Sequence, residues 1–101
     1  MDLEYKREND TVTFFLQGEI DHHAAQGLRQ ELDRRITAMG PEKVVLDLSK
    51  TDFLDSSGLG LILGRVRVAE TIGASLSVTG ANRRIRRILE LCGAKNYLDF
   101  A

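Results

Sequence analysis

A long amphipathic segment between two strand-like runs constrains the fold of this chain more than any other feature. Its apolar residues recur at steps of three and four, and it is followed by Gly40-Pro41, a pair that is typical of a helix C-terminus. Residues 11–16 before it are rich in β-branched and aromatic side chains, and residues 44–48 after it are apolar. Two strands joined by a helix favour parallel pairing through a right-handed crossover. The apolar positions of the helix are Ala25, Leu28, Leu32, Ile36 and Met39.

The N-terminal segment predicts a β-hairpin. Residues 3–7 alternate between apolar and polar, and Asn9-Asp10 supplies a turn before the strand at residues 11–16. Gly18-Glu19-Ile20-Asp21 ends that strand, and Asp21 is an expected N-cap for the helix that follows.

The second half of the chain repeats the alternation of strand and helix. A second helix ends at Gly73, residues 74–79 predict a half-buried strand, and a third helix is expected from about residue 81 to residue 91. Residues 97–100 are expected to form a short last strand or an apolar tail on the sheet. This order predicts one α/β domain over residues 1–101, a mixed four- to five-stranded β-sheet covered by α-helices. Expected inward positions are Leu59, Ile62, Leu63, Val66 and Ala69 in the second helix, and Ile85, Ile88, Leu89 and Cys92 in the third.

Composition narrows the class of function. The hydrophobic fraction of 43% and the charged fraction of 29% are those of a soluble globular protein. The net charge of -1 provides no overall field toward nucleic acid or an anionic membrane. Cys92 is the single cysteine and cannot form an internal disulfide, which fits a reducing cytosol. The N-terminus lacks a signal-peptide pattern, and the apolar run near residues 59–63 is far shorter than the ~20 residues that span a bilayer. We therefore expect a cytoplasmic protein that neither enters a membrane nor binds nucleic acid directly.

The residues that could carry chemistry meet at a strand-to-helix corner, Asp55-Ser56-Ser57-Gly58. Aspartate, serine and glycine are ordinary capping residues at such a corner. Adjacent serines between Asp55 and Gly58 also make an accessible place for the addition of a small charged group. The residues alone leave both interpretations open.

The glycines of this region do not match a phosphate-binding loop. The third glycine, Gly64, follows Gly60 by four residues instead of three, the glycines lie inside the helix, and no Gly-Lys-Ser/Thr end is present. We therefore expect no nucleotide or other cofactor here. Gly60 and Gly64 are instead expected on a helix face that the sheet or a neighbouring helix approaches closely.

Catalysis and metal binding are also not expected. The Gly-x-Ser-x-Gly elbow of hydrolases is absent, because Leu54 occupies the first glycine position relative to Ser56. A base for Ser56 or Ser57 would have to be His22 or His23. These adjacent histidines lack the i,i+4 spacing of a ligating pair on a helix. They are expected to be polar residues of a first helical turn, without a catalytic or metal site.

Four arginines mark the third helix. Because Ile85 and Ile88 are expected to face inward, the arginines should form a solvated stripe. With balanced overall charge, an acidic protein partner or plain solubility accounts for them better than nucleic acid does. They are Arg83, Arg84, Arg86 and Arg87.

Two motifs resemble those of a known family. Asp55-Ser56-Ser57-Gly58-Leu59-Gly60, preceded by an apolar strand and Phe53-Leu54, is similar to the signature of bacterial anti-sigma factor antagonists. These are single STAS domains, a fold shared with sulphate transporters. Gly18-Glu19-Ile20-Asp21-His22-His23 resembles the second motif of the family, and Leu61-Ile62-Leu63-Gly64-Arg65 is similar to its sporulation-type branch. The likeness runs from about residue 11 to residue 100.

The resemblance implies a regulator with no catalytic activity of its own. The dephosphorylated antagonist would bind an anti-sigma factor that is also a serine kinase, and so displace a sigma factor. The kinase would then use ATP to phosphorylate Ser56 and release the product, which a separate serine phosphatase would reset. The family pattern also includes a further helix after the last strand, and this sequence ends at Ala101.

Parallel pairing of the two strands would bring Glu19 and Asp21 near Ser56. Both could then shape a docking surface or a phosphate pocket, although simple N-capping explains Asp21 equally well. An alternative is a STAS-type subunit that senses a small ligand or scaffolds a signalling complex, with Ser56 as a cap only. The expected partner-binding residues are Glu19, Asp21, Asp55, Ser56, Ser57 and Gly58.

Overall fold

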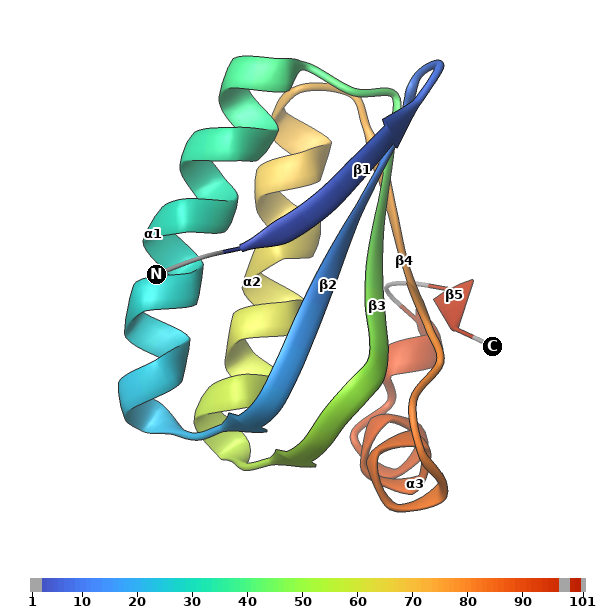
Figure 1. Cartoon of the computed structure of the whole chain (residues 1–101). Helices are drawn as coiled ribbons and strands as arrows, with labels where there is room; N and C mark the ends of the chain where they lie inside the picture. The colour runs from blue at the N-terminus through green and yellow to red at the C-terminus, as the bar shows by residue number, and fades with distance from the viewer. Residues whose placement is uncertain (1–2, 97–98, 101) are drawn as a thin grey trace.

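The computed structural model describes residues 3–96 and 99–100 and contains a mixed sheet in the order β1-β2-β3-β4-β5. Helices α1 and α2 cover one face of this sheet, and α3 lies on the opposite face (Figure 1). The predicted α/β class with a mixed four- to five-stranded sheet is therefore confirmed. The elements are β1 (Glu4–Glu8), β2 (Thr11–Ile20), α1 (His22–Met39), β3 (Lys43–Leu54), α2 (Ser56–Thr71), β4 (Ser75–Thr79), α3 (Arg83–Leu91), the 3-10 helix η1 (Ala94–Asn96) and β5 (Asp99–Phe100).

Strand pairing follows the sequence prediction. β1 and β2 form an antiparallel hairpin whose turn holds Asn9 at φ 55°, a conformation that asparagine tolerates better than most residues. β2 pairs with β3, β3 with β4 and β4 with β5, all in parallel. The predicted parallel pairing across α1 is thus confirmed, as is the short last strand at residues 99–100. Residues 97–98, also part of the predicted C-terminal segment, lie outside the described residues.

Helix α1 has the predicted ends and the predicted buried face. Asp21 is its N-cap and accepts a hydrogen bond from the Ala24 N–H at 2.9 Å. Gly40 ends it at φ 56°, where its own N–H donates to the Ile36 carbonyl at 3.0 Å. The inward side chains Ala25, Leu28, Leu32 and Ile36 are buried against the sheet, and Met39 is partly buried.

The structure extends two strands beyond the apolar runs that predicted them. β2 continues to Ile20 and β3 to Leu54, although the residues near position 50 are polar. The Thr51 hydroxyl is buried and donates to the Leu16 carbonyl at 2.8 Å, so a polar residue is satisfied inside the ladder. The corner between β3 and α2 therefore begins at Asp55, one residue after the strand ends.

The last helix begins later than predicted and ends at the predicted residue, Leu91. Asn82 caps α3 by accepting from the Ile85 N–H at 2.9 Å, so the helix begins at Arg83 and not at residue 81. The expectation that Cys92 points inward is wrong, because the helix ends at Leu91 and Cys92 is exposed. The predicted inward residues Ile85 and Leu89 are buried.

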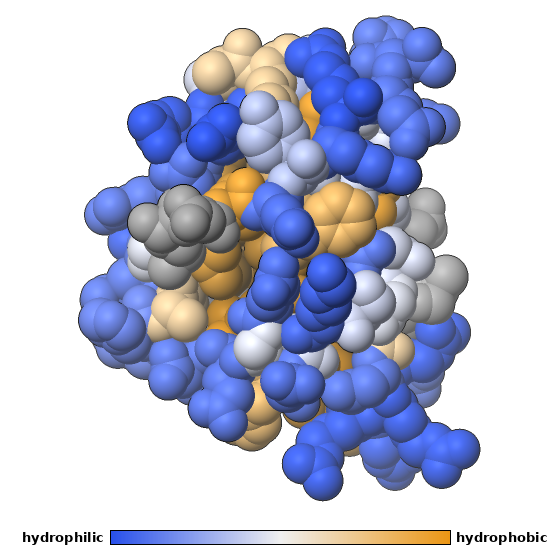
Figure 2. All heavy atoms as spheres, viewed as in Figure 1, coloured by the Kyte–Doolittle hydropathy of each residue, from blue (hydrophilic) through white to orange (hydrophobic). Residues whose placement is uncertain are grey.

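The outer surface of the viewed face is mainly polar. Figure 2 shows hydrophilic residues over most of this face, with apolar residues visible in small patches between them. Among the described residues, none of the helices combines the length and the apolar character needed to cross a bilayer.

Candidate functional site

The candidate site lies where β2 and β3 end side by side. Ile20 and Leu54, the last residues of these strands, are register partners, and the Asp55 N–H donates to the Ile20 carbonyl at 3.4 Å. Each strand is followed directly by an aspartate N-cap, Asp21 for α1 and Asp55 for α2. Two helix N-termini, with their free N–H groups and positive dipole ends, therefore lie next to each other at one edge of the sheet.

Gly58 allows this close approach. A Cβ at this position would lie 2.6 Å from the Ile20 carbonyl oxygen and 2.6 Å from Leu54 Cδ1, so a side chain does not fit without a shift of backbone. The expectation that Gly60 and Gly64 mark a close contact is wrong, because a Cβ on either would meet no atom within 4 Å. The tight point is in the first turn of α2, where the helix leaves the sheet.

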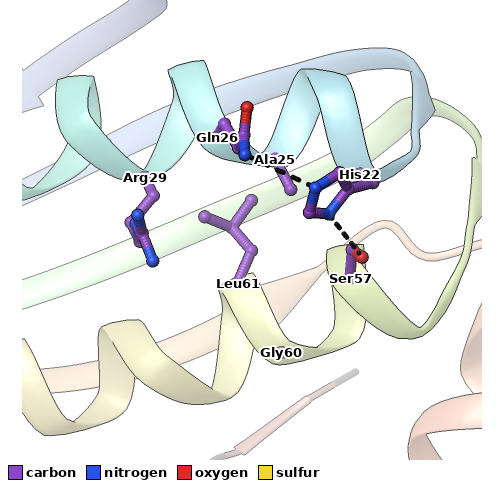
Figure 3. A pocket seen from close by; sticks show the side chains of 7 residues that line it. All are labelled: His22, Ala25, Gln26, Arg29, Ser57, Gly60 and Leu61. Atoms are coloured by element: carbon purple, nitrogen blue, oxygen red, sulfur yellow. Dashed lines mark hydrogen bonds between the residues drawn. The ribbon is translucent and has the colours of Figure 1, made fainter.

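The two serines of the corner have different surroundings. Ser56 is the first residue of α2 and is exposed, whereas Ser57 is half-buried. The Ser57 Oγ lies 3.3 Å from Nδ1 of His22, the first residue of α1 (Figure 3). Asp55, which precedes both serines, accepts a hydrogen bond from the Gly58 N–H at 3.0 Å.

The structure brings the predicted partner-binding residues to one edge of the sheet. Glu19 is exposed near the end of β2, where it is paired with Phe53, and Asp21 is exposed one residue after the strand. Phe53 is 41% exposed at the same edge, a large apolar side chain beside charged ones. The parallel register of β2 and β3 is what places Glu19 and Asp21 beside the Ser56 corner.

A groove of about 260 Å³ runs between the first turns of α1 and α2. Helix α1 contributes three polar side chains and an alanine, and α2 contributes a serine, a glycine and a leucine (Figure 3). Gly60, which carries no side chain, leaves it open on the α2 side. Its lining includes His22, Gln26 and Arg29 from α1 and Ser57, Gly60 and Leu61 from α2.

His22 is the site residue whose role the sequence did not reveal. The sequence predicts only a polar residue of a first helical turn. In the structure its Nδ1 contacts Ser57 Oγ, and its Nε2 lies 3.4 Å from Gln26 Nε2. The available signal was indirect: two parallel strands, each followed at once by an aspartate cap, bring the first turns of their helices together.

A buried ion pair joins the same two helices further along. Arg65 of α2 is buried, and its Nε lies 2.9 Å from Oδ1 of Asp33 on α1. Burial lowers the pKa of Arg65, an effect that Asp33 opposes and Arg29 reinforces. This pair is a contact between α1 and α2. Within residues 3–96 and 99–100, no cluster of three or more histidine, cysteine or acidic side chains is placed to hold a metal ion.

The chain is similar to known proteins over nearly its whole length. The family model described as STAS domain matches residues 2–101. The anti-sigma F factor antagonist of Paenibacillus polymyxa is 33% identical over 93 residues, which cover 92% of this chain and 80% of that protein. The anti-sigma-B factor antagonist of Bacillus subtilis (strain 168) is 25% identical over 101 residues, covering 100% of this chain and 91% of that protein.

Solved structures of anti-sigma factor antagonists have the same fold as this chain. The anti-sigma factor antagonist SpoIIAA in its unphosphorylated form superposes with a TM-score of 0.82 at 26% identity, covering 99% of this chain and 88% of that one. The phosphorylated form of SpoIIAA superposes with a TM-score of 0.75 at 26% identity, covering 99% and 91%.

Proposed function

Because this chain belongs to the STAS domain family and, within it, to the anti-sigma factor antagonists, we propose that it binds an anti-sigma factor with serine kinase activity, and that phosphorylation of Ser56 ends this binding. Such an antagonist is a regulatory protein and not an enzyme, in agreement with the expectation of no catalytic residues. The partner-binding surface of this proposal is the edge formed by Glu19, Asp21, Asp55, Ser56, Ser57 and Gly58.

The observation that carries the proposal is the position of Ser56. Its side chain is exposed at the first position of α2, so a kinase can reach the hydroxyl without opening the fold. A phosphate there adds about -1.5 to -2 charges next to free N–H groups and the positive end of a helix dipole. Each such charge is stabilised by about 0.3–1 kcal/mol at a helix N-terminus. The fold can therefore carry the modification unchanged, in line with the match to SpoIIAA in both forms.

Release of the partner then follows from electrostatics. The exposed carboxylates of Glu19 and Asp21 lie at the same edge as Ser56, so this surface already has negative charge. A phosphate added inside a docked interface brings repulsion and a desolvation cost. Each ~1.4 kcal/mol of that cost lowers the affinity tenfold. The switch is electrostatic and steric and needs no change of fold.

The proposal also includes a phosphatase, a location in the cell and a branch of the family. A serine phosphatase would return the phosphorylated protein to its binding form, and this protein would act in the cytoplasm. The match to an anti-sigma F factor antagonist and the residues 61–65 favour the sporulation-type branch.

The test is phosphorylation by a defined kinase. We would incubate the protein with ATP and the purified anti-sigma F factor of Paenibacillus polymyxa, and measure the intact mass and the modified peptide. The expected result is one phosphate on Ser56, none on Ser56→Ala, and unchanged phosphorylation of Ser57→Ala. If Ser57→Ala lost the phosphate and Ser56→Ala kept it, the assigned residue would be wrong. No phosphate on any variant would favour the ligand-sensing or scaffolding alternative.

A further inference from the structure

We propose that His22 is a specificity-determining residue that makes the two adjacent serines unequal. By donating a hydrogen bond from Nδ1 to Ser57 Oγ, it slows phosphoryl transfer to Ser57 and so favours transfer to Ser56. This inference rests on the proposed function, since it concerns which serine the kinase modifies.

The first argument is the direction of the two side chains. Consecutive residues of a helix project about 100° apart, so only one of the two serines can face α1. Ser57 does so: it is half-buried, lines the groove and points at the His22 ring (Figure 3). Ser56, one position earlier in the same turn, is exposed. A kinase therefore meets one hydroxyl in the open and one turned toward a neighbouring helix.

The second argument is the tautomer of His22, which the hydrogen-bond network assigns. The amide Nε2 of Gln26, which can only donate, lies 3.4 Å from His22 Nε2, and from this placement we assign His22 Nε2 as the acceptor. In the neutral ring the proton is then on Nδ1, which donates to Ser57 Oγ at 3.3 Å. This direction is opposite to that of a serine–histidine catalytic pair, where the ring accepts the serine proton. His22 therefore does not activate Ser57.

The chemistry of transfer explains why this hydrogen bond matters. The attacking serine oxygen uses a lone pair to form a bond to the γ-phosphorus of ATP, while the bond from that phosphorus to the β–γ bridging oxygen breaks. ADP leaves, and the hydroxyl proton passes to a base of the kinase. The bond from His22 engages a lone pair of Ser57 Oγ and holds this oxygen in the groove. Ser56 keeps both lone pairs available to an approaching phosphoryl group.

The test maps the phosphate in variants of the full chain, again with ATP and the anti-sigma F factor of Paenibacillus polymyxa. The wild type should carry phosphate on Ser56, and Ser56→Ala should carry none. In a reaction stopped while Ser56→Ala still carries no detectable phosphate, the double variant Ser56→Ala/His22→Ala should carry phosphate on Ser57, because loss of one net hydrogen bond raises the rate by up to about tenfold. The matched control is Ser56→Ala/His23→Ala, which changes the neighbouring exposed histidine and should stay unphosphorylated.

Two outcomes separate the inference from the function on which it rests. Phosphate on wild-type Ser56 with none on Ser57 of the double variant would overturn the inference alone. No phosphate on the wild type would overturn the proposed function, and with it the selection of one serine. Nuclear magnetic resonance of the imidazole nitrogens provides a readout without a kinase: His22 should hold its proton on Nδ1, and Gln26→Leu should shift it toward Nε2. A proton on Nε2 in the wild type would contradict the assigned tautomer.

Discussion

Asp21 and Asp55 have nearly the same backbone conformation, with φ -94° and ψ -174° for Asp21 and φ -95° and ψ -171° for Asp55. Each follows the end of one of two paired parallel strands, and each carboxylate accepts the N–H three residues further on. The first turns of α1 and α2 are therefore built alike and lie together. That repetition places His22 against Ser57 and leaves Ser56 exposed.

Loss of either cap should destabilise the fold. We expect Asp55→Ala to lower the free energy of unfolding by about 1 kcal/mol, because the Gly58 N–H then loses its acceptor at the helix terminus. Asp21→Ala is the matched comparison and should cost a similar amount. Urea unfolding followed by circular dichroism measures both. Unchanged stability in both variants would show that the caps do not contribute.

Gly58→Ala should be far more disruptive than Gly60→Ala. The added Cβ at position 58 would overlap the Ile20 carbonyl and the Leu54 side chain, and we expect a loss of about 1–3 kcal/mol. At position 60 the Cβ meets no atom within 4 Å, and an alanine in a helix is favoured over glycine by about 0.5–1 kcal/mol. Denaturant titration of the two variants should therefore show opposite signs. Equal effects would contradict the close approach at Gly58.

A negative charge at Ser56 should weaken partner binding without unfolding the protein. We expect Ser56→Asp to bind the anti-sigma F factor of Paenibacillus polymyxa at least tenfold more weakly than the wild type, a difference of ~1.4 kcal/mol. Its circular dichroism spectrum should match that of the wild type, since the side chain is exposed at a helix N-terminus. Calorimetric titration measures the affinity, with Ser56→Ala as the uncharged control. An unchanged affinity for Ser56→Asp would argue against an electrostatic switch.

The Arg65–Asp33 pair should respond differently to changes at its two ends. Asp33→Ala leaves a buried guanidinium without its partner, and we expect a loss of about 1–3 kcal/mol. Arg65→Met removes the buried charge and keeps much of the volume, while the Asp33 side chain is 40% exposed and returns to water. That variant should be close to neutral or more stable. Thermal unfolding of both at low protein concentration checks the asymmetry.

Acid should lower the stability of the fold through the ion pairs of Glu31 on α1. Hydrogen bonds from Arg34 and Arg35, at 2.7 and 3.0 Å, hold the pKa of Glu31 below its ordinary value. A carboxyl whose pKa is lowered by folding contributes stability above its unfolded pKa and loses it as the pH falls through the folded pKa. We expect Glu31→Gln to flatten the acid limb of the stability curve. The measurement is the free energy of unfolding of the wild type and of Glu31→Gln from neutral pH down to about pH 3. If both proteins lost the same stability over this range, Glu31 would not contribute.

The sequence alone determined the elements and their order. The apolar spacing of α1, its aspartate cap and Gly40 are local signals, and local backbone preference and side-chain burial are enough to read them. The parallel pairing of β2 with β3 followed from the helix between them. The motif with the serines and the motif with the histidines could also be recognised from the sequence, because the residues of each motif are consecutive in the chain.

Only the tertiary structure decided which residues meet. The contact between His22 and Ser57 joins positions 35 residues apart, and it depends on the register of two strands, which an apolar run does not specify to one residue. The same register selected Gly58, and not Gly60 or Gly64, as the glycine under steric constraint. Spacing along one helix cannot reveal how near another element comes. The strand pairing and the two aspartate caps together set that distance, and so distinguish Ser56 from Ser57.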